Sequence, residues 1–294
     1  MSSCYRLIDA EKASYPVSVL CRVLKVSRSG YYDWKERSPS KRELENADLT
    51  ERIRQIHHRS RETYGFLRVH AELRALGVHC NRKRVARLMR KDGLRGCMRG
   101  RRRKHTTRQD PLAVAAPDLV ERNFCAPAPN KLWTADITYL PTDEGFVYLA
   151  FILDVYSRRV VGWSMANHLR SELVAAALEM AIRRRNPSAG LIHHSDRGSQ
   201  YTALSFGKKL EEVGIMPSMS RVGSALDNAI SESFVSTLKS EMGARRYPTR
   251  QAARTSVFGF IELFYNRVRR HSALGYLSPS EYEQAIVVEE AAVA

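Results

Sequence analysis

The chain has 294 residues and a mass of 33.5 kDa, a length that accommodates about two domains of ordinary size. Hydrophobic residues make up 44% of it, which is enough for a sizeable core, but the longest apolar run, residues 146–153, is too short to cross a membrane. The N-terminus lacks the layout of a secretory signal, and the five cysteines include no CxxC pair. These features argue against secreted, membrane and zinc-ribbon proteins and predict a reducing, cytoplasmic location.

Basic residues are concentrated in the first third of the chain. Lys and Arg number 48 against 31 Asp and Glu, a net charge of +17. Residues 1–110 carry 28 basic and 12 acidic side chains, whereas residues 111–294 carry 20 and 19. A generically basic surface would spread this excess over both parts. The asymmetry therefore favours a nucleic-acid-binding region joined to a separate working domain.

Short helices separated by turns are predicted at the N-terminus. Pro16 suits the first turn of a helix whose apolar side chains recur over residues 17–24. Ser27 can cap the next helix, which carries three aromatic residues. Residues 1–42 are therefore predicted to form a helix-turn-helix-like segment.

A second helical DNA-binding domain is predicted over residues 43–98. Gly77 is expected to end one of its helices and Asn81 to cap the next. The last helix has a densely basic outer face, which is typical of a helix-turn-helix, although a three-helix bundle with a solvated basic face gives the same pattern. The helices are expected at residues 49–58, 66–76 and 82–91, and the candidate DNA contacts are Arg82, Lys83, Arg84 and Arg87.

Residues 99–129 have the composition of a linker. A run of like charge is followed by a stretch rich in proline and alanine. Such a run can be a solvated tether, but between a DNA-binding region and a catalytic part it is expected to follow DNA phosphates. The candidate DNA contacts in this run are Arg101, Arg102, Arg103 and Lys104.

The remainder of the chain predicts a mixed α/β layer fold with helices on the faces of a sheet. Ser171 is expected to cap the first helix of this part. Strands are expected at residues 132–140, 146–154, 160–165, 191–194 and 215–219, and helices at 171–185, 204–213 and 229–242.

Three carboxylates fall where such a fold could bring them together. Asp136 lies within the first strand, Asp196 follows the fourth, and Glu232 lies in the last helix. The first two are separated by 59 residues and the last two by 35. A charge inside an apolar strand is costly unless it is paired or binds a metal, and hard oxygen ligands suit Mg²⁺ or Mn²⁺. The three residues are therefore candidate metal ligands.

These motifs resemble the Asp, Asp and Glu of DDE transposases and retroviral integrases, which share a ribonuclease-H-like core. The similarity extends over residues 15–283 and points to the second-reading-frame product of bacterial insertion sequences that encode their transposase in two overlapping frames. It implies a five-stranded mixed sheet with helices on both faces at residues 130–245, followed by a helical, basic extension at 246–294. Motifs that carry it include Val26-Ser-Arg-Ser-Gly-Tyr-Tyr, Asn81-Arg-Lys-Arg-Val-Ala-Arg-Leu-Met, Asp154-Val-Tyr-Ser-Arg-Arg-Val-Val-Gly-Trp and Arg270-His-Ser-Ala-Leu-Gly-Tyr.

The resemblance implies a transposase that cleaves DNA 3′ ends and transfers strands with two Mg²⁺ or Mn²⁺ ions. Asp136 would bridge both ions, Asp196 would hold one and Glu232 the other. In the two-frame group this joins one element end to its partner strand, giving a circular form that is later integrated. The expected partners are the terminal inverted repeats, target DNA and further copies of the chain, in a cytoplasmic, nucleoid-associated complex.

Several neighbours of the triad are further candidates. Lys239 shares the helix face of Glu232; the resemblance implies a DNA phosphate contact, the alternative being a solvated lysine. His194, Arg197 and Gln200 flank Asp196 and could orient substrate, although His194 could equally be structural. Asp227 and Asn228 are expected to shape a turn. A basic, aromatic C-terminal segment could grip DNA or pack on the core, through Arg267, Arg270 and His271.

The sequence departs from the wider family in two ways. His57, His58 and Cys80 are present, but the second cysteine of an integrase-type zinc bundle is missing, so no structural zinc is expected. Two-frame transposases also function as fusions with an upstream-frame segment, and this chain has no heptad run of its own. Alternatives are therefore a catalytic half that needs this fusion, a nuclease or junction resolvase of the same fold, and a DNA-binding regulator of transposition.

Overall fold

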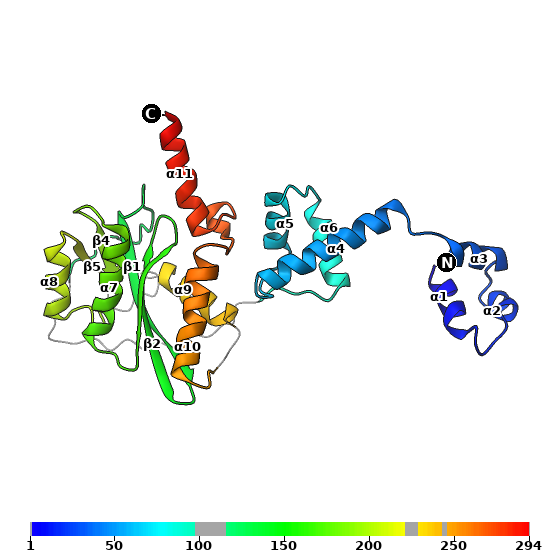
Figure 1. Cartoon of the computed structure of the whole chain (residues 1–294), viewed down its shortest axis with the longest axis horizontal. Helices are drawn as coiled ribbons and strands as arrows, with labels where there is room; N and C mark the ends of the chain where they lie inside the picture. Colours follow the sequence, from blue (N-terminus) through cyan, green and yellow to red (C-terminus); the bar gives the residue numbers. More distant parts are fainter. Residues whose placement is uncertain (1, 98–115, 221–228, 243–245, 294) are drawn as a thin grey trace. The chain divides into compact units, whose positions relative to one another are not determined.

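The structure, a computed structural model, describes residues 2–97, 116–220, 229–242 and 246–293. By its internal contacts the chain divides into two units, Met1–Arg52 and Ile53–Ala294 (Figure 1). The expected basic run at residues 101–104 and the expected turn residues Asp227 and Asn228 lie outside the described residues.

The N-terminal unit is helical and packs around one aromatic residue. Tyr31 is buried together with Ile8 and Cys21, and its hydroxyl donates a hydrogen bond to the Asp9 carboxylate at 2.9 Å. Ser27 caps a helix as expected, because its side chain accepts the Gly30 backbone N–H at 3.0 Å. The helices are α1 (Ser2–Glu11), α2 (Val17–Val23), α3 (Arg28–Glu36) and the first part of α4 (Lys41–Arg59).

Two of these helices differ from the sequence-based expectation. The α1 helix was not expected, and its buried residue Ile8 packs on the aromatic cluster, a tertiary contact that local periodicity does not reveal. The α4 helix was expected from residue 49 but begins at Lys41. Ser40 and Glu43 explain the earlier start, because each side chain accepts the backbone N–H of the other, which is a capping box.

The second unit begins with the helix-turn-helix-like region. After α4 come α5 (Phe66–Ala75) and α6 (Arg82–Lys91), which pack against each other. Gly77 ends α5 as expected, with a backbone φ of +76° that favours glycine. Asn81 caps α6 as expected, because its side chain accepts the Lys83 backbone N–H at 2.8 Å.

A mixed sheet forms the centre of the second unit. In the described residues it has five strands in the order β3-β2-β1-β4-β5. The first three strands form an antiparallel meander, whereas β4 runs parallel to both β1 and β5. This topology confirms the mixed five-stranded sheet that the resemblance implied. The strands are β1 (Leu132–Thr142), β2 (Gly145–Asp154), β3 (Val160–Ala166), β4 (Ile192–Ser195) and β5 (Met216–Met219).

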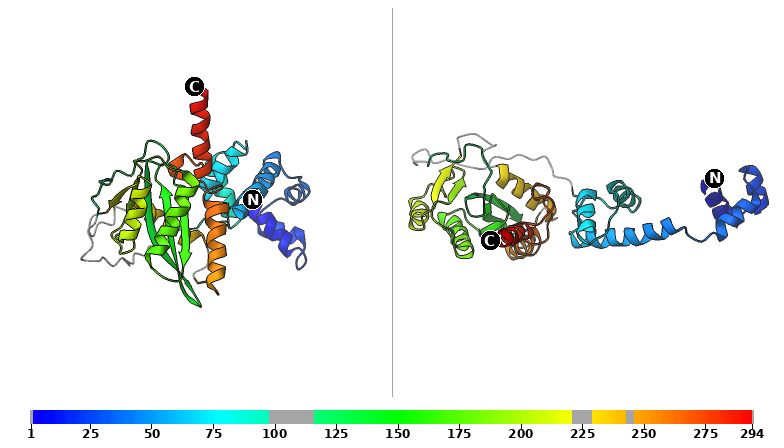
Figure 2. Two further views of the ribbon diagram at one scale, coloured as in Figure 1. Left: turned by 60° about the vertical axis from the view of Figure 1, so that its left-hand side comes forward. Right: turned by 90° about the horizontal axis from the view of Figure 1, so that it is seen from above.

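Helices cover both faces of this sheet, as expected (Figure 2). On one face, α7 (Ser171–Arg185) and α8 (Leu204–Glu212) bury a cluster that includes Trp133 and Ala135 of β1. On the other, α9 (Ala229–Glu241) and α10 (Arg250–Phe258) pack on the sheet; the ring of Phe234 in α9 lies 4.6 Å from that of Phe151, between centroids. The expected cap of α7 is wrong: Arg170 occupies the cap position, and Ser171 is already helical.

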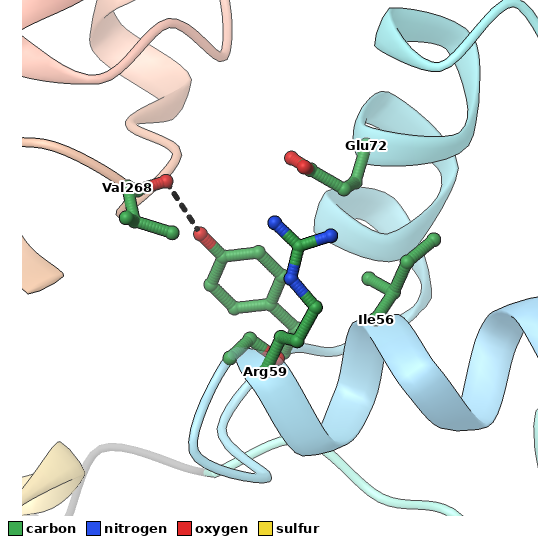
Figure 3. A pocket seen from close by; sticks show the side chains of 6 residues that line it. Ile56, Arg59, Glu72 and Val268 are labelled. Carbon is green, nitrogen blue, oxygen red and sulfur yellow. Dashed lines mark hydrogen bonds between the residues drawn. The ribbon is translucent and has the colours of Figure 1, made fainter.

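The C-terminal segment contacts the helix-turn-helix-like region. The Tyr64 hydroxyl accepts the backbone N–H of Arg270 at 2.7 Å. It also donates to the carbonyl of Val268 at 3.3 Å, the hydrogen bond drawn as a dashed line in Figure 3. A small pocket lies here, and none of the three acidic candidates lines it. The segment comprises the π-helix η2 (Gly259–Tyr265), the 3₁₀-helix η3 (Ser272–Leu274) and α11 (Pro279–Val293). No helix in the described ranges has the length and apolar character needed to span a membrane.

Candidate active site

Strand register brings two of the acidic candidates side by side. In the parallel pairing of β1 with β4, Trp133 lies opposite His193 and Thr134 opposite His194. Continuing that register by two residues places Asp136 level with Asp196, just beyond the last paired residues. Neighbouring strands are about 4.8 Å apart, so the two carboxylates start from adjacent backbone positions.

The third acidic candidate is brought in by a helix that packs on the same face as Asp136. Side chains alternate along a strand, so Asp136 shares its face with Thr134. The Thr134 hydroxyl lies 2.9 Å from the Ser231 hydroxyl of α9, and both residues are fully buried. Glu232, the next residue of α9, is exposed and interacts electrostatically with Asp136.

The carboxyl of Asp136 has the perturbed chemistry expected of an acidic cluster. Burial, together with the negative charges of Asp196 and Glu232, raises its pKa from 3.8 to about 7. A hydrogen bond from the Ile137 backbone N–H and the nearby Lys239 ammonium act in the opposite sense. The cluster therefore disfavours a third negative charge unless a cation compensates it.

The three acidic side chains offer the kind of ligand that a hard cation prefers, but their carboxylate oxygens do not surround a common point. All three side chains supply carboxylate oxygens, which Mg²⁺ and Mn²⁺ prefer. Within the described ranges, no three His, Cys, Asp or Glu side chains lie close enough together to hold a metal ion. Coordination by all three would require the carboxylates to approach one another.

Lys239 lies on the same helix as Glu232 and near Asp136. Its ammonium nitrogen is 4.7 Å from the centre of the Tyr139 ring, a cation–π contact with β1. Partial removal from water lowers the pKa of Lys239, and the attraction of Asp136 opposes that change. A cation is thus held beside the carboxylates.

The residues that flank Asp196 mainly anchor its loop. Arg197 donates through Nε to the carbonyl of Ser220 at 2.8 Å, and Gln200 donates to the carbonyl of Leu169 at 2.9 Å. His194 is fully buried, with Nδ1 2.9 Å from the hydroxyl of Ser218. Of the two roles considered for His194, these contacts favour the structural one, and together they fix the loop that carries Asp196.

The predicted DNA contacts divide by exposure. On α6, Arg82, Lys83 and Arg87 are exposed, whereas Arg84 is half-buried. These residues form the expected basic outer face.

Two of the C-terminal candidates lie inside the protein. Arg270 is buried, and its guanidinium pairs with Glu72 at 2.6 Å and with Glu281 at 2.9 Å. His271 is buried as well, and desolvation together with neighbouring arginines holds its pKa well below the ordinary value. This arrangement favours packing over a DNA grip for both residues, while Arg267 is exposed.

Three residues near the carboxylates were not singled out from the sequence. Thr134 and Ser231 connect the strand of Asp136 to the helix of Glu232. Tyr201 belongs to the same motif as Asp196 and interacts electrostatically with both aspartates. Thr134 and Ser231 are close in sequence to Asp136 and Glu232, but only the folded pairing shows that they meet.

Comparisons with known proteins agree with this architecture. Two models, each described as an integrase core domain, match residues 126–225 and 213–279, and an HTH-like domain model matches residues 43–102. The IS600 31 kDa protein of Shigella sonnei is 44% identical over 90% of this chain and 97% of its own length. The transposase of IS904 from Lactococcus lactis subsp. lactis is 41% identical over 84% of this chain and 98% of its own length.

Solved integrases also resemble the chain at low sequence identity. A simian T-cell lymphotropic virus intasome chain aligns with a TM-score of 0.45 and 15% identity over 73% of this chain and 70% of its own. The HTLV-2 integrase catalytic core, solved with magnesium, aligns with a TM-score of 0.43 and 15% identity over 54% of this chain and 99% of its own.

Transposase InsF of IS3A from Escherichia coli K12 is a sequence relative: it is 39% identical over 95% of this chain and 98% of its own length. The chain therefore belongs to the insertion-sequence transposases that include InsF of IS3, enzymes with an integrase core and a ribonuclease-H-like fold.

Proposed function

We propose that this transposase cleaves the 3′ ends of its element and transfers them to a second DNA strand with Asp136, Asp196 and Glu232 as its catalytic carboxylates. The observation that supports this assignment is the β1–β4 register, which brings Asp136 level with Asp196, together with the electrostatic interaction of Asp136 with both Asp196 and Glu232. The match to the integrase core over residues 126–225 and 213–279 covers all three positions.

The same three residues would hold the metal. Asp136, central to the other two acids, would contact two divalent ions, with Asp196 holding one and Glu232 the other. When bound, such ions supply Lewis-acid stabilisation of the attacking and leaving oxygens of a phosphodiester. The raised pKa of Asp136 supports this, since a cation offsets the mutual repulsion of the carboxylates.

The reaction proceeds by a hydrolysis and then a transesterification, and neither step needs a covalent protein–DNA bond. Water attacks a phosphorus at the element end, the P–O3′ bond breaks, and a free 3′-OH remains. That 3′-OH then attacks a second phosphodiester: a new P–O bond forms, the P–O3′ bond of that phosphodiester breaks, and the 3′-OH of the other strand leaves. Lys239, held over Tyr139, binds the phosphate of the reacting strand and orients it toward the carboxylates.

The remaining parts of the chain would hold the DNA. The two helical parts, residues 1–42 and 43–98, would bind the terminal inverted repeats. The linker, residues 99–129, would follow DNA phosphates. The reaction would take place on the core at residues 130–245, and the extension at 246–294 would support that core. Two DNA ends and a target must be held at once, so we propose that several copies assemble on DNA. Joining of one end to its partner strand would yield a circular form, and an upstream-frame segment would complete the active protein.

A plasmid assay tests this function. The 294-residue chain, alone or fused to the upstream-frame segment, is added with Mg²⁺ or Mn²⁺ to a supercoiled plasmid carrying both element ends. Primer extension then maps 3′-OH ends and joined products. We expect cleavage and joining that disappear with Asp196→Asn. Binding to the ends without any cleavage in either form would contradict the proposal and favour a regulator.

A further inference from the structure

Tyr201 is a buried tyrosine with an unusual hydroxyl. Only 4% of the residue is exposed, and its ring packs against those of His193 and Phe206, with centroids 6.1 and 5.6 Å away. Its hydroxyl finds no hydrogen-bond partner among the described residues. Buried phenols are normally paired, because an unpaired polar group costs free energy that a phenylalanine in the same space would avoid.

The backbone connects the same residue to Asp196. The Gly198 N–H donates to the Asp196 carboxylate at 3.1 Å, and the Gly198 carbonyl accepts the N–H of Tyr201 at 2.9 Å. A Cβ at position 198 would lie 3.1 Å from Asp196 Oδ1, so this turn is closely wrapped around the carboxylate. Tyr201 therefore stands one tight turn beyond Asp196.

The hydroxyl also lies within the electrostatic reach of both aspartates. Burial, together with the charges of Asp136 and Asp196, raises the pKa of Tyr201 well above 10. The phenol consequently keeps its proton and can act only as a donor toward a carboxylate.

We propose that Tyr201 is a positioning residue of the active site, whose hydroxyl donates a hydrogen bond to the Asp136–Asp196 pair when these carboxylates bind a divalent cation. This inference rests on the proposed function, because it assigns the two aspartates to a metal site. It explains why a tyrosine occupies a place that phenylalanine would fill without an unpaired hydroxyl. Groups that orient metal-ligating carboxylates typically contribute about tenfold or more in metal affinity.

The test compares Tyr201→Phe with Tyr148→Phe in the full chain. Tyr148 packs at the edge of the same cluster, on β2, so it controls for the loss of a phenol hydroxyl as such. Mn²⁺ affinity is measured by isothermal titration calorimetry, and metal-free stability by urea unfolding. We expect Tyr201→Phe to weaken Mn²⁺ binding about tenfold while its metal-free unfolding midpoint is unchanged or higher.

Each other outcome counts against the inference. If Tyr201→Phe binds Mn²⁺ as Tyr148→Phe does, the hydroxyl does not act on the carboxylates. If Tyr201→Phe lowers metal-free stability together with Mn²⁺ affinity, its role is structural. Asp136→Asn separates the two proposals. If Mn²⁺ binding survives Asp136→Asn, the metal site itself is overturned. If Asp136→Asn abolishes Mn²⁺ binding but Tyr201→Phe binds Mn²⁺ normally, only the role of Tyr201 is overturned.

Discussion

Thr134 Oγ1 on β1 lies 2.9 Å from Ser231 Oγ on α9, and both side chains are fully buried. Asp136 is two residues beyond Thr134 on the strand, and Glu232 directly follows Ser231 on the helix. This hydrogen bond therefore connects the two elements that carry Asp136 and Glu232. Because packing alone allows a helix to slide on a sheet, a directional bond at this point fixes the position of Glu232 relative to Asp136.

Ser231→Ala should weaken this connection. We expect a loss of about 1 kcal/mol in the free energy of unfolding, the usual net contribution of one hydrogen bond, and slower DNA joining. Urea unfolding of Ser231→Ala, Thr134→Val and the double variant measures the coupling between the two residues. Ser233→Ala, at an exposed position of α9, is the control. Strictly additive effects of the two substitutions would mean that the hydroxyls do not interact.

Neutral substitutions of the triad should separate catalysis from binding. We expect Asp136→Asn, Asp196→Asn and Glu232→Gln each to lower cleavage and joining by about 1,000-fold or more, because each removes a metal-binding charge. Binding to the element ends should stay within about threefold, since binding depends on basic residues. Gel shifts and strand-transfer assays give the two quantities.

Asp143→Asn is the matched control for these substitutions. Asp143 is an exposed carboxylate beyond the end of β1 that pairs with Arg246, so its charge can be removed without touching the cluster. Near-normal joining by any one triad variant would remove that residue from the catalytic set. Equal losses in the control would point to a general charge effect.

Much of the fold could be predicted because its signals are local. Residue types that favour strands, together with one continuous apolar run at residues 146–153, predicted all five strands. The caps at Ser27 and Asn81 were predicted from the side chains at the helix starts. The α1 helix was missed because it depends on burying Ile8 against residues distant in sequence. The early start of α4 does have a local signal, the capping box at Ser40 and Glu43, which lies well ahead of the first apolar residues of the helix.

The site could be predicted in part for a similar reason. Asp136, Asp196 and Glu232 stand out as residue types in their local context, but the β1–β4 register that places two of them side by side is a long-range property. Exposure is equally invisible to a charge pattern. Arg270 and Arg267 lie in one basic motif, yet the first is buried with Glu72 and the second is exposed.

The pKa of Asp136 predicts a pH-dependent stability in the absence of metal. The native carboxyl binds a proton up to about pH 7, whereas the unfolded chain releases it near 3.8. The native state therefore holds more protons between these values, so this group makes stability fall as pH rises from about 4 to about 7. Asp136→Asn removes this loss of stability. The variant should therefore have a higher Tm than the wild type at about pH 8, and the difference in Tm should be much smaller at about pH 5.

Thermal unfolding in EDTA at the two pH values measures this difference directly. All other titrating groups are shared by the two proteins, so their contributions largely cancel in the comparison. A Tm difference that does not change with pH would show that the Asp136 carboxyl titrates near its ordinary value. That result would also remove one support for a crowded acidic cluster.

Arg270 should behave as a structural residue. Its guanidinium pairs with Glu72 at 2.6 Å in a largely buried setting, so Arg270→Met would leave that carboxylate uncompensated. We expect a loss of about 2–4 kcal/mol in the free energy of unfolding and an unchanged salt dependence of DNA binding. Arg267→Met, at an exposed position in the same motif, should leave stability within about 0.5 kcal/mol. A lower salt slope for Arg270→Met with intact stability would instead make it a DNA contact.

The exposed basic face of α6 should contribute to DNA affinity through charge. Replacing Arg82, Lys83 or Arg87 with alanine should lower the log–log salt slope by about 0.9 for every DNA phosphate that the side chain neutralises. Neutralising residues 101–104 should weaken binding equally on all sequences, because a run of like charge follows phosphates. The role of α6 follows from how the loss of affinity depends on DNA sequence. A uniform loss means phosphate binding, whereas a loss confined to the element ends means that the helix reads bases in a groove. Fluorescence anisotropy on end-derived and scrambled duplexes at several salt concentrations distinguishes these two binding modes. An unchanged salt slope in all variants would place the DNA elsewhere on the protein.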